Sequence, residues 1–164
     1  MNSTAEEFVA LYDRCADAIF RHCCFRLFEY ESARDVTQET FTRTWKYIAE
    51  GGTVHNMRAF LYRVANNLIV DISRKRKVSS LHAIQEKGFD IGFEDPGISI
   101  QRMDAKAAFV LLRKLNVKYR DVIVMRYIDE LTVREIAGIL GESENTISVR
   151  IHRGIQKLCT ILES

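Results

Sequence analysis

Apolar side chains recur every three or four residues through most of this chain, a spacing typical of amphipathic helices. In the first half the pattern predicts one helix over residues 5–28, a second over 32–49 and a third that begins near Met57 and ends in the cationic run at residues 74–77. The third helix has the broadest apolar face, formed by Leu61, Val64, Ala65, Leu68, Ile69 and Ile72.

The clearest motif lies near the end of the chain, where residues 131–158 have the pattern of a helix-turn-helix. Thr132 can cap the first helix, and Glu135, three residues later, completes a capping box. Gly141 stands where that helix must end in a sharp turn, and Ser143 can cap the second helix. The apolar stripe of the second helix is expected to be Ile147, Ile151, Ile155 and Leu158.

Helical periodicity fails between residues 78 and 101, and it resumes in two predicted helices over 104–115 and 118–128. The intervening segment contains the single proline, three glycines and four acidic side chains. We therefore expect a flexible acidic linker with Phe89 and Phe93 exposed. No part of the chain has a strand pattern, so the predicted fold is all-α: two small helical domains, residues 1–77 and 102–164, joined by the linker 78–101.

Charge is distributed unevenly along the 164 residues, although the net charge is only +2. Residues 1–77 hold 12 basic and 10 acidic side chains, residues 78–101 hold one and four, and residues 102–164 hold 11 and eight. Two mildly basic blocks thus flank an acidic segment, which suggests two units that face nucleic acid. No apolar run approaches the roughly 20 residues that span a bilayer. The N-terminus lacks the pattern of a signal peptide, so we expect a cytoplasmic protein without a membrane segment of its own.

Four cysteines raise the question of a metal or redox site, but none forms a CxxC pair. Cys15 and Cys23 fall on the apolar stripe of the first helix, where thiols behave as small hydrophobes. We expect structural thiols, with the neighbouring His22 at the surface or half-buried. No metal and no organic cofactor is predicted.

The outward face of the second motif helix has the chemistry of a DNA reader. Amide, hydroxyl and guanidinium groups suit the edges of bases in a major groove, and flanking cations suit phosphates. A generic helical hairpin is the alternative. The residues predicted to contact DNA there are Asn145, Ser148, Val149, Arg150, His152, Arg153, Gln156 and Lys157.

The polar face of the third helix has a different character. Amides and guanidinium groups spaced one turn apart could hold a single strand of nucleic acid, although the run at its end is also typical of a solvated helix terminus. The candidates on this helix are Arg63, Asn66, Asn67, Arg74, Lys75, Arg76 and Lys77.

The polar face of the second helix holds acids but no accompanying nucleophile, phosphate loop or metal cluster. The acids could form a general acid/base pair, but without these partners an enzyme is not indicated, and a plain solvated face is the other interpretation.

Three segments, in order, resemble a bacterial sigma factor of the extracytoplasmic-function type. DVTQETFTRTW at 35–45 resembles region 2.2 of that family, FLYRVANNLIVDISRKRK at 60–77 resembles regions 2.3 and 2.4, and the segment 119–158 resembles region 4. The resemblance covers nearly the whole chain. It implies a promoter-specificity subunit that binds core RNA polymerase and promoter DNA, and not an enzyme.

The same resemblance assigns roles to residues. Asp35, Gln38, Glu39 and Arg43 would dock on the β′ clamp of the polymerase, and region 4 would meet the β flap. Asn66, Asn67 and the loop 51–56 would capture a base flipped from the minus-ten element, and residues 74–77 would hold the neighbouring backbone. The second motif helix would enter the major groove at the minus-thirty-five element.

The resemblance also implies an anti-sigma factor that holds the protein inactive. Ser148, Val149 and His152 depart from the common family pattern, which leaves the target sequence open. Two other classes remain open on the residues alone. One is a stand-alone helix-turn-helix regulator that binds duplex DNA as a dimer, and the other is a regulatory enzyme or thiol sensor.

Overall fold

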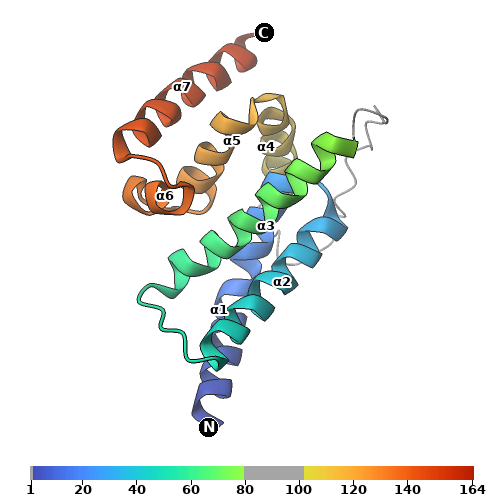
Figure 1. Cartoon of the computed structure of the whole chain (residues 1–164). Helices are drawn as coiled ribbons and strands as arrows, with labels where there is room; N and C mark the ends of the chain where they lie inside the picture. The colour runs from blue at the N-terminus through green and yellow to red at the C-terminus, as the bar shows by residue number, and fades with distance from the viewer. Residues whose placement is uncertain (1, 80–101) are drawn as a thin grey trace.

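Three long helices form the N-terminal half of the computed structural model, which describes residues 2–79 and 102–164. They are α1 (Asn2–Leu27), α2 (Tyr30–Ala49) and α3 (Met57–Ser79), and they pack side by side (Figure 1). Their apolar stripes meet in a core that includes Ile19, Val36 and Leu61, as the periodicity predicts.

Threonines on the inner face of α2 are buried with the apolar residues. The hydroxyls of Thr40 and Thr44 donate to the carbonyls of Val36 and Thr40, four residues back, at 2.6 and 2.8 Å. These bonds satisfy the hydroxyls without another polar side chain. The opposite, polar face of α2 lies toward solvent.

The C-terminal half consists of α4 (Arg102–Lys114), α5 (Val117–Ile123), a π-helical turn η2 (Val124–Ile128), α6 (Val133–Leu140) and α7 (Glu144–Glu163). Helices α6 and α7 form the predicted helix-turn-helix. Thr132 and Glu135 form the reciprocal capping box, and the side chain of Ser143 accepts a hydrogen bond from the amide of Thr146. Gly141 turns the chain in the left-handed conformation, with φ 68°. No strand occurs in the described ranges, so the all-α prediction is confirmed.

Two local expectations are wrong. Ile155 is 37% exposed, and Gly154 lies on the buried face of α7 beside Ile123 in its place. A helix turns 100° per residue, so Gly154 stays in line with Ile147 and Ile151 while Ile155 turns away. The predicted continuous α-helix over 118–128 is also interrupted by η2, whose last turn closes with the amide of Asp129 bonded to the carbonyl of Val124.

The two halves pack against each other, with α1 against η2 and α3 against α6. The ring of Phe109, from α4, is fully buried and stacks on Phe25 of α1 with centroids 4.1 Å apart. Phe28, at the positive φ of 55° that ends α1, presents its ring edge-on to Phe109. The predicted linker, with Phe89 and Phe93, lies outside the described residues except for its first two positions, which continue α3. None of the helices that the structure describes has the length and apolar content needed to cross a bilayer.

Candidate nucleic-acid interface

The outward face of α7 is solvent-exposed, as a recognition helix requires. Buried Ile147, Ile151 and Gly154 hold the helix on α5 and α6. Val149 is 38% exposed and therefore faces solvent with the polar residues, where its methyl groups could meet a thymine methyl. The other exposed members of the predicted set are Asn145, Ser148, His152, Arg153, Gln156 and Lys157.

Cations on and beside this face differ in how they are held. Arg150 is paired with Glu142 at 2.9 Å, and the ammonium of Lys157 lies 5.2 Å from the centre of the Tyr119 ring. Arg153 is exposed, and no ion pair or hydrogen bond engages its side chain within the described ranges. Arg153 is thus the cation of this face that is available to a DNA backbone or base without breaking a contact.

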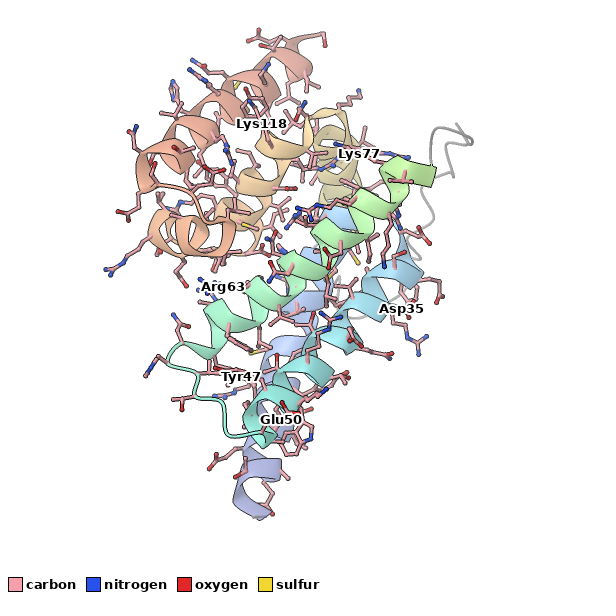
Figure 2. The ribbon with its side chains drawn as sticks, viewed as in Figure 1. Asp35, Tyr47, Glu50, Arg63, Lys77 and Lys118 are labelled. Atoms are coloured by element: carbon pink, nitrogen blue, oxygen red, sulfur yellow. The ribbon has the colours of Figure 1, made fainter. Side chains whose placement is uncertain are left out.

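The predicted docking residues on α2 also share one exposed face. Asp35, Gln38, Glu39 and Arg43 are all exposed, and Figure 2 shows Asp35 on the side of α2 turned away from the C-terminal half. Glu39 and Arg43 form an ion pair at 2.8 Å, one turn apart. An exposed pair of this kind contributes only about 0.3–0.5 kcal/mol, so a partner could replace it at little cost.

The predicted single-strand surface of α3 is divided by the fold. Asn67 and the run from Arg74 to Lys77 are exposed, although Arg76 bonds to Glu29 at 2.8 Å and to Ser32 at 2.9 Å. Asn66 is instead only 5% exposed. Neighbouring residues on a helix point 100° apart, so the two asparagines cannot share one face.

Arg63 and Asn66 contact other parts of the protein. The Arg63 guanidinium donates to the carbonyl of Gly138, in α6, at 2.9 Å. The side-chain carbonyl of Asn66 accepts from Arg26, in α1, at 3.0 Å. Two of the side chains predicted to hold DNA are therefore bonded to other residues of the same protein.

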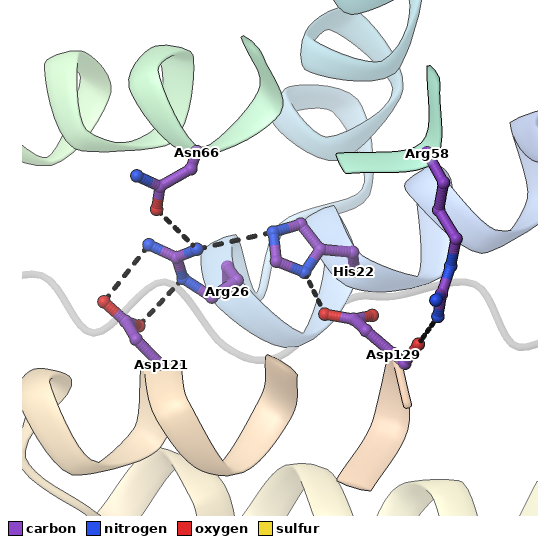
Figure 3. Close-up of polar contacts among 6 residues, drawn as sticks. All are labelled: His22, Arg26, Arg58, Asn66, Asp121 and Asp129. Atoms are coloured by element: carbon purple, nitrogen blue, oxygen red, sulfur yellow. Dashed lines mark hydrogen bonds and ion pairs between the residues drawn. The ribbon is translucent and has the colours of Figure 1, made fainter. Parts of the chain in front are cut away.

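A buried polar cluster lies where the halves meet, and Figure 3 shows its six members. We call it the seam network, and it comprises His22, Arg26, Arg58, Asn66, Asp121 and Asp129. Arg26 is bidentate to Asp121, with distances of 2.8 Å from Nε and 3.1 Å from Nη2. Its acceptors come from both halves of the chain, so the network depends on their contact.

His22 is 0% exposed, which corrects the prediction of a surface or half-buried position. Its Nδ1–H donates to the Asp129 carboxylate, and its Nε2 accepts from Arg26 at 3.4 Å. Because a guanidinium can only donate, Nε2 is the acceptor toward Arg26 and Nδ1 the donor toward Asp129. His22 and Arg26 lie one helical turn apart beside the apolar stripe of α1, which was the available signal that both face inward.

Arg58 and Tyr62 complete the seam on α3. Arg58 donates to the backbone carbonyl of Asp129, at the end of η2, and lies 5.8 Å from the centre of the Tyr62 ring. Tyr62 is buried and meets His22 edge-on. Burial and the negative charge of Asp129 raise the pKa of Tyr62, so its hydroxyl stays protonated.

The cysteines do not form a site in the part of the chain that the structure describes. Cys23 and Cys24 are buried, Cys15 is partly buried and Cys159 is exposed, which corrects the expectation of a structural thiol at that position. Burial raises the pKa of the Cys23 thiol to about 12, against the lowering effects of a hydrogen bond with Thr37 and the charge of Arg26. No cluster of three or more metal-ligating side chains occurs among the described residues.

Comparison with known proteins gives matches to both halves. Residues 11–78 match the family model for Sigma-70 region 2, and residues 107–158 match the model for Sigma-70, region 4. The ECF RNA polymerase sigma factor SigW of Bacillus subtilis (strain 168) is 32% identical, over 93% of this chain and 87% of its own length. The ECF RNA polymerase sigma factor SigL of Mycobacterium tuberculosis is 28% identical, over 94% of this chain and 88% of its own.

Two solved structures share the fold. CnrH in complex with the cytosolic domain of CnrY has a TM-score of 0.73 and 24% identity, and the match covers 97% of this chain and 89% of that one. The sigma factor RpoE in complex with the anti-sigma factor NepR from Bartonella quintana has a TM-score of 0.77 and 19% identity, covering 96% and 98%.

The cysteine environments predict selective alkylation of the folded protein at pH 8. Iodoacetamide should modify Cys159 readily and Cys15 more slowly, because only the thiolate reacts and only accessible sulfurs are reached. With a pKa of about 12, roughly one Cys23 thiol in ten thousand is ionised at pH 8. Mass spectrometry of tryptic peptides measures the rates. Modification of Cys23 as fast as Cys159 would contradict this assignment.

Proposed function

Because this chain belongs to the sigma-70 family of RNA polymerase sigma factors, within the ECF type, we propose that it binds core polymerase, directs it to promoters and melts them. The supporting observation is that one chain presents three separate polar surfaces. These are the face of α2, the face of α3 and the face of α7. A stand-alone regulator has no use for the first two, and the match to region 2 disfavours that alternative.

We assign the polymerase contact to the exposed face of α2, where Asp35, Gln38, Glu39 and Arg43 would meet the β′ clamp. Region 4, within residues 102–164, would contact the β flap. Residues 1–77 would form region 2, and residues 78–101 would link the two.

We assign the DNA contacts to α3 and α7. Asn67, together with Asn66 and Arg63 once these are accessible, would hold the melted minus-ten strand, and residues 74–77 would neutralise its backbone. The exposed face of α7 would read the minus-thirty-five element in the major groove, with Arg153 as its available cation.

We further infer control by an anti-sigma factor. Two fold relatives, CnrH and RpoE, were solved with CnrY and with the anti-sigma factor NepR. A sigma factor acts where polymerase and chromosome are, so the proposed location is the cytoplasm, and the proposed role requires no enzymatic activity and no cofactor.

The direct test is transcription reconstituted from purified core polymerase, this protein and genome fragments, with sequencing of RNA 5′ ends. We expect RNA start points that appear only when the protein is present. The DNA upstream of them should share two sequence elements, each at its own distance from the start point. A mixture with core polymerase alone is the control. Absence of protein-dependent starts, together with failure to co-purify with core polymerase, would refute the function.

Two alanine variants separate the proposed DNA contacts at a promoter found in this way. Asn67→Ala should impair strand opening, measured by permanganate reactivity, more than closed-complex formation, because Asn67 lies on the single-strand surface. Arg153→Ala should weaken duplex binding, measured by footprinting, by roughly tenfold, the lower range for loss of a specific contact. Arg14→Ala removes an exposed arginine of α1 that belongs to none of the proposed surfaces and is the matched control. Equal effects of both variants on both steps would contradict the assignment.

A further inference from the structure

We propose that the contact between the two halves is an autoinhibitory latch, formed by the seam network together with Phe109. In the free protein Asp121 and Asp129 would hold the halves together through Arg26 and His22, so that the C-terminal half engages Arg63 on the single-strand surface of α3. The proposal rests on the function proposed above, because that function assigns the binding of melted promoter DNA to the surface that closure partly engages.

Phe109 supplies the apolar part of the latch. Its ring is fully buried between the halves, stacked on Phe25 and edge-on to Phe28. Separation of the halves would expose all three rings to water. The burial of these rings favours the closed form, but it does not determine the conditions under which the halves separate.

The charges make the latch conditional. The Arg26 side chain is only 2% exposed, and Asp121 neutralises it across the seam while Asp129 accepts from His22. When the halves separate, water can solvate all four side chains. Removal of the two carboxylates therefore destabilises the closed form, which keeps a buried guanidinium unpaired, and leaves the open form nearly unchanged.

The arginines of α3 connect the latch to DNA binding. The amide of Glu142 bonds to Ala137, which leaves the Gly138 carbonyl at the end of α6 to accept from Arg63. Arg58 similarly donates to the Asp129 carbonyl at the end of η2. Carbonyls at a helix C-terminus carry partial negative charge, and phosphate oxygens would compete for the same guanidinium groups.

Closure leaves the other surfaces accessible. The docking face of α2, Asn67 and the reading face of α7 are exposed, whereas Arg63 is engaged by Gly138 of the C-terminal half. Core polymerase could thus bind region 2 before the latch opens. A pocket of about 520 Å³ that is partly open to solvent lies along the seam, lined by Arg21, Tyr62 and Tyr127 among others.

Distance measurement between spin labels in the full chain tests the latch. The labels are placed on native Cys159 and on a cysteine introduced at exposed Glu50, in a Cys15→Ala background. The original protein should give one narrow distance distribution. Asp121→Ala/Asp129→Ala should add a broad, longer population, with the ratio of closed to open molecules reduced roughly tenfold or more. Asp13→Ala/Asp17→Ala removes two exposed carboxylates of α1 and is the matched control.

Arg58→Ala provides a second variant, because its side chain is 45% exposed and its partners, Glu135 and the Asp129 carbonyl, lie in the other half. It should shift the distribution in the same direction by a smaller amount. Circular dichroism confirms that helix content is retained. Narrow distributions identical to the control in both variants would overturn the latch.

Transcription provides the functional half of the test. At a promoter found as above, Asp121→Ala/Asp129→Ala should reach half-maximal RNA synthesis at a several-fold lower protein concentration than the Asp13→Ala/Asp17→Ala control. If the halves separate but the half-maximal concentration does not fall, closure is not inhibitory and the proposal fails. If no protein in the series supports transcription, the function fails, while the distances still decide whether the closed form exists.

Discussion

A buried guanidinium needs acceptors close at hand, and Arg26 obtains them from three different helices. It donates to Asn66 in α3, to His22 one turn earlier in α1, and to Asp121 in α5. Asp121 lies in the other half of the chain. Its carboxylate therefore neutralises the charge of Arg26 only while the two halves are in contact. Arg26 thus joins Asn66, His22 and Asp121 in one cluster that crosses between the halves.

The division between accessible and covered surfaces follows from that constraint. Helices α2 and α7 lie away from the seam, so their polar faces are available to partners at all times (Figure 1). Helix α3 packs against α6, where Arg63 bonds to Gly138, whereas Asn66 is held by Arg26 of its own half and Asn67 is exposed. The surface proposed to bind melted DNA is thereby partly engaged within the protein, and the surfaces proposed to contact polymerase and duplex DNA are not.

Local patterns in the sequence predicted the helices and the caps of the helix-turn-helix, because apolar spacing and capping chemistry act within one turn. The failures arise where distant segments decide the outcome. The prediction places His22 near the surface, whereas its burial is accompanied by bonds to Arg26 and to Asp129, which lies 107 residues away. Asn66 was grouped with Asn67 because its partner Arg26 could not be foreseen. Ile155 was placed inside because its spacing matched, although Gly154 permits the closer approach to Ile123.

Hydrogen–deuterium exchange of the protein, free and bound to core polymerase, tests most directly whether the closed contact between the halves opens when the protein binds polymerase. Peptides that cover η2 and the following turn to Leu131 should be protected in the free protein and exchange faster in the complex, because Arg58 and His22 no longer hold Asp129. The α2 peptide with Glu39 should change in the opposite direction. Unchanged or increased protection of η2 in the complex, with α2 protected, would show that the halves stay joined on the polymerase and would contradict the account.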